Sequence, residues 1–252
     1  MKILSIVNQK GGVGKTTTTI NLAACLYKMK RKVLLIDLDP QSNATRGSGI
    51  DTTSITTSIN DVLLDRSNID NVILSSTCNG FDLLPATPEL TESEVNLITK
   101  DDREFILRDK LNQISSRYDY ILMDCPPSLN ILTVNSLVSA TGVLIPVQCE
   151  FYALQGLSEL INTIKKIQNT SNENLKIEGI LRTMYDSRNN LSNDVSEQLK
   201  EYFPDNLYKT KIPRNIRVAE APSYGMSILE YDGLSKGSLS YYSLAGEVVK
   251  NE

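Results

Sequence analysis

Short apolar runs alternate with stretches of helical periodicity along the whole chain. Segments such as Val33-Leu34-Leu35-Ile36 are apolar at every position, which is typical of strands buried on both faces of a parallel sheet. Strands of this kind are predicted at 2–7, 32–37, 81–85, 119–123, 142–147 and 177–182. Helices are predicted at 15–29, 57–64, 89–97, 104–116, 130–139, 153–168, 192–203, 214–220 and 240–249. The alternation predicts a doubly wound α/β fold, with a mostly parallel sheet and helices on both faces.

Two polar segments, 42–58 and 183–193, interrupt this alternation. The first is rich in Ser, Thr, Asn and Gly and is expected to be a mobile loop after the second strand. The second is also expected to be a loop. Core-like strands resume after each, which argues against a domain linker. A chain of 252 residues can bury one sizeable core, so we predict a single domain over 1–252.

Composition is that of a soluble globular protein, with 40% hydrophobic and 22% charged residues. The sequence shows neither a secretion signal at its N-terminus nor the roughly 18 consecutive apolar residues that indicate a membrane span. We therefore expect a cytoplasmic protein that does not bind membranes. The absence of histidine excludes His-ligated zinc and Ser-His-Asp catalysis. The four cysteines lie far apart and are expected to be reduced thiols.

A glycine-rich segment, Lys10-Gly11-Gly12-Val13-Gly14-Lys15-Thr16-Thr17, lies between the first predicted strand and the first helix. Glycines at such a junction let backbone N–H groups close around phosphate oxygens, and the helix N-terminus adds positive charge. Lys15 is expected to reach the β- and γ-phosphates, and the Thr16 hydroxyl to bind Mg²⁺. The alternative is a simple glycine turn. Because motif, loop and context agree, we predict a P-loop nucleoside triphosphatase fold.

The loop departs from the standard pattern at its first positions. Gln9 stands where the standard spacing has glycine, and Lys10 follows it. A lysine at this point is poorly placed for the γ-phosphate of its own nucleotide but can reach that of a neighbouring molecule.

Three aspartates at the ends of predicted strands are candidates for the chemistry of phosphoryl transfer to water. Asp39 follows the second strand and can orient or partly deprotonate the attacking water, although an Asp before Pro40 also commonly caps a turn. Asp37 is expected to support the Mg²⁺ shell. Asp124 ends an apolar run, as a Walker B aspartate does, and is expected to hold Mg²⁺ directly or through water.

The lysine-bearing loop resembles the deviant Walker A loop of the ParA/MinD class of ATPases, and the chain as a whole resembles the chromosomal ParA proteins, often called Soj. The segments that carry the resemblance are 10–16, 35–41, 124–128, 146–150 and 212–217. The resemblance implies slow ATP hydrolysis with Mg²⁺. It also implies an ATP-bound homodimer, in which Lys10 of each subunit reaches the phosphates of the other. Glu150 is either a further contact at this interface or a solvated loop carboxylate.

The same resemblance assigns roles to individual residues. Asp39 becomes the water-activating carboxylate, so that Lys10, Lys15 and Asp39 are the expected catalytic set. The turn at Pro126-Pro127 senses the γ-phosphate, and adenine lies against the 212–215 segment, with Met184 and Tyr185 as alternative walls. The expected ATP-binding residues are Lys10, Gly11, Gly12, Val13, Gly14, Lys15, Thr16, Thr17, Pro126, Pro213, Arg214 and Asn215, and the expected metal ligands are Thr16, Asp37 and Asp124.

The net charge of −4 alone argues against nucleic acid as a partner. Net charge is a weak criterion when basic residues cluster, so the prediction of DNA binding depends on where these residues lie. Segment 206–217 holds four basic residues and no acidic one, and Arg182 and Arg188 precede it. The resemblance implies that Arg188 and Arg217 bind double-stranded DNA without sequence preference. The alternatives are a solvated basic edge and, for Arg214, a contact to nucleotide or to the second subunit.

The resemblance implies a DNA-partitioning switch on the nucleoid, in which a ParB/Spo0J-like protein stimulates hydrolysis and release, with a replication initiator as a further candidate partner. Three alternatives share the fold. A membrane-positioning ATPase of the MinD kind needs a basic amphipathic C-terminal helix, whereas this tail is mildly acidic. An iron–sulfur carrier needs paired cysteines, and only Cys125 is suitably placed. A scaffold without turnover would not need Lys10, Lys15, Asp39 and Asp124.

Overall fold

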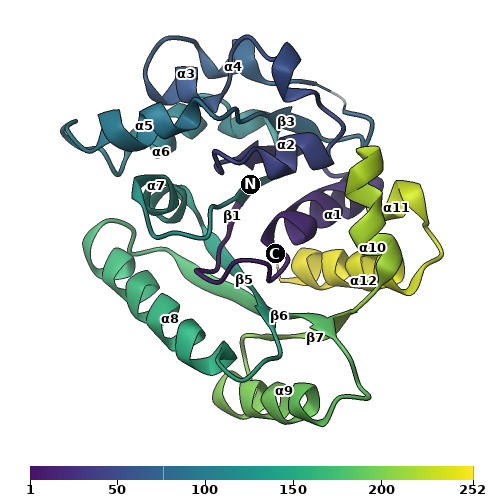
Figure 1. The fold of residues 1–252 in the computed structure, drawn as a ribbon. Helices are drawn as coiled ribbons and strands as arrows, with labels where there is room; N and C mark the ends of the chain where they lie inside the picture. Colours follow the sequence, from purple (N-terminus) through teal and green to yellow (C-terminus); the bar gives the residue numbers. More distant parts are fainter. Residues whose placement is uncertain (76, 252) are drawn as a thin grey trace.

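The computed structural model describes residues 1–75 and 77–251, and its centre is a seven-stranded parallel sheet with the strand order β3-β2-β4-β1-β5-β6-β7 (Figure 1). The strands are β1 (Lys2–Ile6), β2 (Val33–Asp37), β3 (Asp82–Leu84), β4 (Tyr120–Asp124), β5 (Gly142–Gln148), β6 (Lys176–Tyr185) and β7 (Leu207–Pro213). The chain order reverses on either side of β1. This reversal places the β1–α1 loop at the switch point, where α/β folds bind ligands.

Helices cover both faces of the sheet (Figure 1). They are α1 (Lys15–Lys28), α2 (Asn43–Gly47), α3 (Ile59–Leu63), α4 (Ile69–Val72), α5 (Leu90–Leu97), α6 (Ile106–Asn112), α7 (Ile131–Ser139), α8 (Ala153–Thr170), α9 (Asn190–Tyr202), α10 (Ile216–Glu220), α11 (Ile228–Tyr231) and α12 (Lys236–Lys250), with short 3₁₀ helices η1 (Thr52–Ser54), η2 (Ser115–Arg117) and η3 (Ala221–Tyr224). No helix within the described residues is long and apolar enough to cross a membrane.

Alternate residues of the central strands enter two separate hydrophobic cores. In β2, Leu34 and Ile36 pack into the core beneath α3 and α5 to α9, whereas Val33 and Leu35 pack into the core beneath α1 and α12. Each of these four side chains is buried. The continuous apolar runs in the sequence therefore correspond, as predicted, to strands that are buried on both faces of the sheet.

The structure confirms the predicted fold and the six predicted strands, and it adds β7 at the edge of the sheet. Sequence analysis predicted no strand in this segment because Lys209 and Lys211 interrupt its apolar positions. The 42–58 segment is not simply a loop, since α2 and η1 form within it. The 183–193 loop is shorter than predicted: β6 continues to Tyr185 and α9 begins at Asn190.

Candidate nucleotide-binding site

The glycine-rich loop connects β1 to α1 and adopts a conformation that requires glycine. Gly12 and Gly14 have φ angles of 74° and 87°, in the left-handed region that side chains disfavour. Gly14 is also the N-cap of α1, and its carbonyl accepts the first bond of the helix, from Thr18 N at 2.9 Å. The loop thus ends at the N-terminus of a 14-residue helix, where unpaired N–H groups and the helix dipole favour an anion.

Lys15 is the cation at the base of this loop. Only 7% of the residue is exposed, and its Nζ donates to the Lys10 carbonyl at 3.3 Å. Burial lowers the pKa of the Lys15 ammonium, and the carboxylates of Asp124 and Asp39 oppose this shift. A buried cation with one weak backbone partner, inside a loop shaped for an anion, is suited to charge-assisted bonds with phosphate.

Asp124 lies at the end of β4, beside the first turn of α1. Its two carboxylate oxygens accept hydrogen bonds from Thr16 Oγ1 at 2.7 Å and from Thr19 Oγ1 at 3.1 Å. Burial, and next the nearby Asp37, raises the pKa of Asp124 to about 8. An oxygen set made of a hydroxyl and a carboxylate fits Mg²⁺, which keeps most of its ligands as water or phosphate oxygens. Thr16 and Asp124 would hold the ion, which supplies positive charge to the phosphates.

Asp37 is fully buried, and its carboxylate accepts hydrogen bonds from residues that follow it in the chain. One oxygen accepts from Asp39 N at 3.1 Å, and the other from Thr45 N and Thr45 Oγ1, both at 2.8 Å. Burial raises the pKa of Asp37 to about 6. These bonds fix α2 and the backbone of Asp39, so the geometry favours an indirect role beside the metal. Direct ligation by Asp37 stays a prediction.

Asp39 follows β2 and is 8% exposed. One of its carboxylate oxygens accepts from Gln41 N at 2.9 Å, so the residue does form the turn that Asp before Pro commonly makes. The same carboxyl group lies close enough to Lys15 and Asp124 to influence their pKa values. Asp39 can therefore form the turn and also lie near the phosphate loop, because the turn uses only one of its two carboxylate oxygens.

The turn after β4 is held by an asparagine that sequence analysis missed. Asn130 caps α7, and its Oδ1 accepts from Leu132 N and Thr133 N, both at 3.1 Å. Its Nδ2 donates to the carboxylate of Glu94 in α5. Thr133 Oγ1 in turn donates to Ser128 O at 2.7 Å. The turn that contains Pro126 is thereby linked to α5. An asparagine immediately before a helical pattern is a capping signal that could have identified Asn130.

Cys125 lies in this turn as a buried packing residue. Its sulfur contacts Ser136 Oγ at 3.1 Å and Ser5 Oγ at 3.4 Å, and burial raises the pKa of the thiol to about 11. A thiol with this pKa is rarely a thiolate near neutral pH, so it is a poor nucleophile or cluster ligand. Within the described residues, no group of three His, Cys, Asp or Glu side chains could hold a metal.

A cavity of 540 Å³ extends from the phosphate loop toward the β7–α10 segment. It is lined by Gly12, Gly14, Thr17, Thr183, Met184, Ile212, Pro213, Arg214, Asn215, Ile216, Val218, Ala219, Glu220, Ser223 and Tyr241. The two predicted adenine walls, 212–215 and Met184, therefore line one cavity, while Tyr185 is not among its lining residues. Thr183 Oγ1 donates to Val13 O at 2.7 Å and ties β6 to the loop. A mostly apolar cavity with a few polar groups suits a base.

Lys10, in contrast to the buried Lys15, is an exposed residue of the loop. Its Nζ is paired with the carboxylate of Glu150, and the two side chains are 42% and 44% exposed. The backbone N–H of Lys10 is held by Asn8 Oδ1 at 2.9 Å. An exposed ion pair of this kind contributes little stability, so Lys10 can exchange Glu150 for another anion at low cost.

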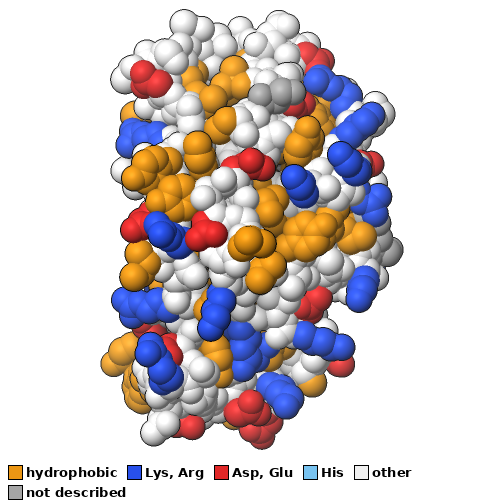
Figure 2. Space-filling model, turned by 90° about the vertical axis from the view of Figure 1, so that its right-hand side faces the viewer, with side chains coloured by type: hydrophobic (Ala, Val, Ile, Leu, Met, Phe, Trp, Pro, Cys, Tyr) orange, Lys and Arg blue, Asp and Glu red, His pale blue; other side chains and the backbone are white. Residues whose placement is uncertain are grey.

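The expected DNA-binding arginines lie on the surface, each beside a carboxylate. Arg188 donates from Nε and Nη2 to Asp186 at 2.9 and 2.8 Å, and Arg217 pairs with Glu220 at 3.2 Å. Figure 2 shows Lys and Arg side chains, with acidic ones among them, at the lower end of the face that carries α10 to α12, at the level of β7 in Figure 1, and a second group at the upper right of this face. Arg182 is not part of this surface: it is buried and donates to Ser196 Oγ at 3.0 Å.

Taken together, the sheet order, the glycine loop, the buried lysine and the Thr16–Asp124 pair define a P-loop nucleoside triphosphatase with a deviant loop. A family model described as an AAA domain matches residues 1–177.

Two relatives match over nearly the whole chain. The sporulation initiation inhibitor protein Soj of Bacillus subtilis is 48% identical over 250 residues, covering 99% of both chains. The chromosome partitioning protein ParA of Myxococcus xanthus is 48% identical, covering all of this chain and 89% of the relative. The chain belongs to the ParA/Soj family of chromosome-partitioning ATPases.

A solved structure also resembles this one closely. It is described as cobyrinic acid a,c-diamide synthase from Mycobacterium smegmatis with bound ATP analogue and magnesium, and it superposes with a TM-score of 0.88 at 34% identity. The match covers 99% of this chain and 95% of the other. This neighbour agrees with the prediction of ATP and Mg²⁺ as ligands.

We expect Asp124→Asn to stabilise the nucleotide-free, metal-free protein. The pKa of Asp124 is raised to about 8 from an ordinary 3.8, so the folded state binds the extra proton. The free energy of unfolding is therefore higher at low pH, where Asp124 is protonated, and it falls as the pH rises toward 8 and the buried carboxyl group ionises. Thermal unfolding in EDTA from pH 5 to 9 measures the effect, with each kcal/mol worth roughly 2–4 °C in Tm. Equal slopes of Tm against pH in both proteins would contradict the expectation.

Proposed function

We propose that this protein is an ATP-dependent DNA-partitioning switch. In this proposal an ATP-bound sandwich dimer binds DNA without sequence preference on the nucleoid, in the cytoplasm. A ParB-like partner then stimulates hydrolysis and release, so that chromosome origins or plasmids are segregated. The observation that carries the proposal is the 48% sequence identity to Soj and to ParA over nearly the whole chain, combined with a phosphate loop that contains Lys10, Lys15 and Thr16.

The position of Lys10 supports an ATP-dependent dimer. Its ammonium is turned outward to Glu150, away from the buried Lys15 that serves the same loop. A cation in this place is available to the phosphates of a second subunit that faces the loop. Closing two nucleotides against each other brings like charges together, and such cations offset that cost. The γ-phosphate would then control the exchange between monomer and dimer.

The surface arginines support DNA binding through phosphates. Non-specific contacts need positive charge without base recognition, and exposed arginines on one surface meet this need. The net charge of −4 makes binding by a monomer weak, whereas dimerisation doubles the number of arginines that face one duplex. Arg188 and Arg217 each have a carboxylate partner, which a DNA phosphate would replace.

The experiment is DNA binding by Asp39→Ala protein, in which hydrolysis is expected to stall, with ATP and with ADP over a salt series. Binding should require ATP and weaken steeply with salt. Arg188→Ala and Arg217→Ala should each weaken it, and each should lower the slope of log K against log salt by about 0.9 per lost phosphate contact. Arg108→Ala is a matched control, since Arg108 is an exposed arginine on α6 with its guanidinium over Phe105.

Binding that ignores the nucleotide, or that persists unchanged in both arginine variants, would refute the DNA switch. The membrane alternative has little structural support in α12. The apolar side chains Tyr241, Leu244 and Val248 of this helix are buried in the core beside α1 and are therefore not available to a lipid surface.

A further inference from the structure

We propose that the exposed face of α5 is the docking site for a cationic segment of the ParB-like partner, and that Glu94 transmits this contact to the hydrolytic site. The inference rests on the proposed function, and it adds a surface, a chemistry of recognition and a positioning residue.

Helix α5 buries one side and leaves apolar residues on the other. Leu90 and Leu97 are fully buried, whereas Val95 is 69% and Ile98, at the C-cap, 58% exposed. Val95 and Ile98 are three residues apart, so they lie on the same face, and exposed Thr91 precedes Val95 by one turn. Most of the surface of these two neighbouring aliphatic side chains is therefore free to contact a partner.

The surroundings of this apolar pair are acidic. Segment 89–104 contains six acidic and two basic residues. One of the basic residues, Arg103, donates to the carbonyl of Ile98 at 2.7 Å, and the other, Lys100, pairs with Asp65 at 3.2 Å. Six acidic against two basic residues leave this segment with a net charge of −4, which favours a positively charged polypeptide over nucleic acid. Because Val95 and Ile98 are apolar, a matching segment of the partner would carry apolar side chains next to its basic ones.

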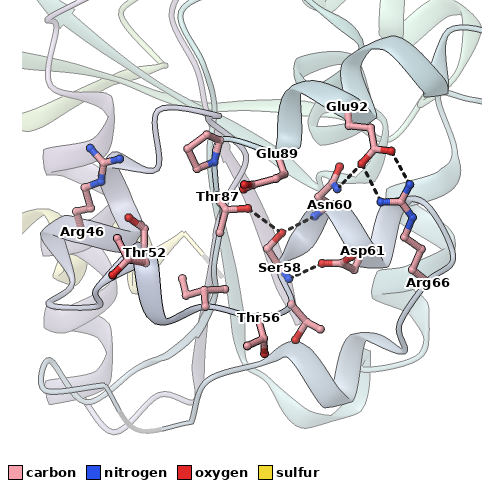
Figure 3. A pocket seen from close by; sticks show the side chains of 14 residues that line it. Arg46, Thr52, Thr56, Ser58, Asn60, Asp61, Arg66, Thr87, Glu89 and Glu92 are labelled. Carbon is pink, nitrogen blue, oxygen red and sulfur yellow. Dashed lines mark hydrogen bonds and ion pairs between the residues drawn. The ribbon is translucent and has the colours of Figure 1, made fainter.

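A cavity also lies at the N-terminal end of α5. It has a volume of 560 Å³ between α5, α3 and the 52–58 segment (Figure 3). Glu89 and Glu92 lie along one side; Glu92 is already held by Arg66, while Glu89 lies beside Thr87. A long basic side chain of the partner that entered this cavity would meet Glu89, beside the two arginines that also line it, Arg46 and Arg66.

The cavity is connected to the hydrolytic aspartate by hydrogen bonds. Thr87 Oγ1 donates to Ser58 Oγ at 3.3 Å, and the preceding residue, Ala86, donates its N–H to Thr45 Oγ1 at 3.0 Å. Thr45 in turn holds the carboxylate of Asp37, which accepts from the backbone N–H of Asp39. A ligand that shifts this wall of the cavity would therefore shift the backbone of Asp39.

Glu94 provides a second and more direct link. Its carboxylate accepts from Asn130, whose own carbonyl caps α7 behind the Pro126-Pro127 turn. Burial, and then repulsion from Asp39, raises the pKa of Glu94. Ile98 lies four residues after Glu94, about one helical turn further along the same side of α5. A cation docked beside Ile98 would compete with Asn130 for this carboxylate, and the turn and Asp39 would reorganise together. Glu94 is thus a positioning residue.

The test measures ATP hydrolysis with DNA and increasing amounts of the ParB-like protein of the same organism. Val95→Ser and Ile98→Ser should leave basal turnover unchanged and require roughly tenfold more partner for half-maximal stimulation. Leu239→Ser, at an equally exposed leucine on α12, is the control. Thr91→Lys adds a positive charge to the face and should weaken stimulation most at low salt.

Two substitutions at Glu94 separate charge from hydrogen bonding. Glu94→Gln keeps an acceptor for Asn130 but lacks the charge, and it should lose most of the stimulation. Glu94→Ala also removes the acceptor, and it should in addition change basal kcat with little change in KM for ATP. A purely structural role for Glu94 would instead move kcat and thermal stability in both variants without affecting the stimulation factor.

The outcomes distinguish this inference from the proposed function. If the partner does not stimulate the unmodified protein, the proposed function fails and the docking site with it. If the partner stimulates the unmodified protein and all of the α5 variants equally, the function stands and the α5 site is wrong. Loss of stimulation in Leu239→Ser to the same extent as in Ile98→Ser would also overturn it.

Discussion

Lys15→Ala should weaken nucleotide binding severely. Lys15 is the buried cation of the phosphate loop, with a single weak bond to the Lys10 carbonyl at 3.3 Å. Removing one partner from a buried, hydrogen-bonded charge pair costs about 2–5 kcal/mol, which is a loss of roughly 30-fold to several thousandfold in affinity. Isothermal titration of ATP and of ADP with Mg²⁺ measures the effect on both ligands.

The same loop offers a matched control. Lys10→Ala removes an equal charge five residues away, from a side chain that is 42% exposed and paired with Glu150. This variant should keep the nucleotide affinity of the unmodified protein while remaining monomeric with ATP in light scattering. Tight ATP binding by Lys15→Ala, or equal losses in both variants, would refute the division of roles between the two lysines.

Much of this site follows from patterns that are local in the sequence. The strand, loop and helix around Gly12 and Gly14 are contiguous, and the left-handed backbone there demands glycine. The buried strand before Asp124 is likewise an unbroken apolar run. Such features depend on the residues themselves, so the loop and the strand end were predicted correctly.

What sequence analysis missed depends on contacts between distant segments. The place of Asp37 at a strand end suggested a role beside Mg²⁺, but it did not reveal the hydrogen bonds that its carboxylate accepts from Thr45 and from the backbone of Asp39. The bond between Glu94 and Asn130 joins residues 36 positions apart. Strand β7 is stabilised by pairing with β6 at the sheet edge rather than by an apolar run of its own. No local pattern encodes these contacts.

Asp39→Ala should bind ATP and stall its hydrolysis. Asp39 is 8% exposed, with one oxygen fixed by Gln41 N–H, and its carboxylate lies close enough to Lys15 and Asp124 to influence their pKa values. A positioned general base contributes roughly 10²–10⁴ in rate, and we expect kcat to fall by this factor with little change in ATP affinity. Phosphate release under single-turnover conditions measures the step directly.

Stalled hydrolysis should also change the state of assembly. If the γ-phosphate holds the dimer together, Asp39→Ala should remain dimeric with ATP for far longer than the unmodified protein, and it should return to monomer with ADP. Adding Lys10→Ala to this variant should prevent the dimer even though ATP stays bound, because the outward cation is missing. Turnover of Asp39→Ala at the normal rate would exclude Asp39 as the base and would limit it to the turn it forms with Gln41. If Asp39→Ala stalls hydrolysis but stays monomeric with ATP, the catalytic role of Asp39 stands. Bound ATP would then not be sufficient to hold the dimer together.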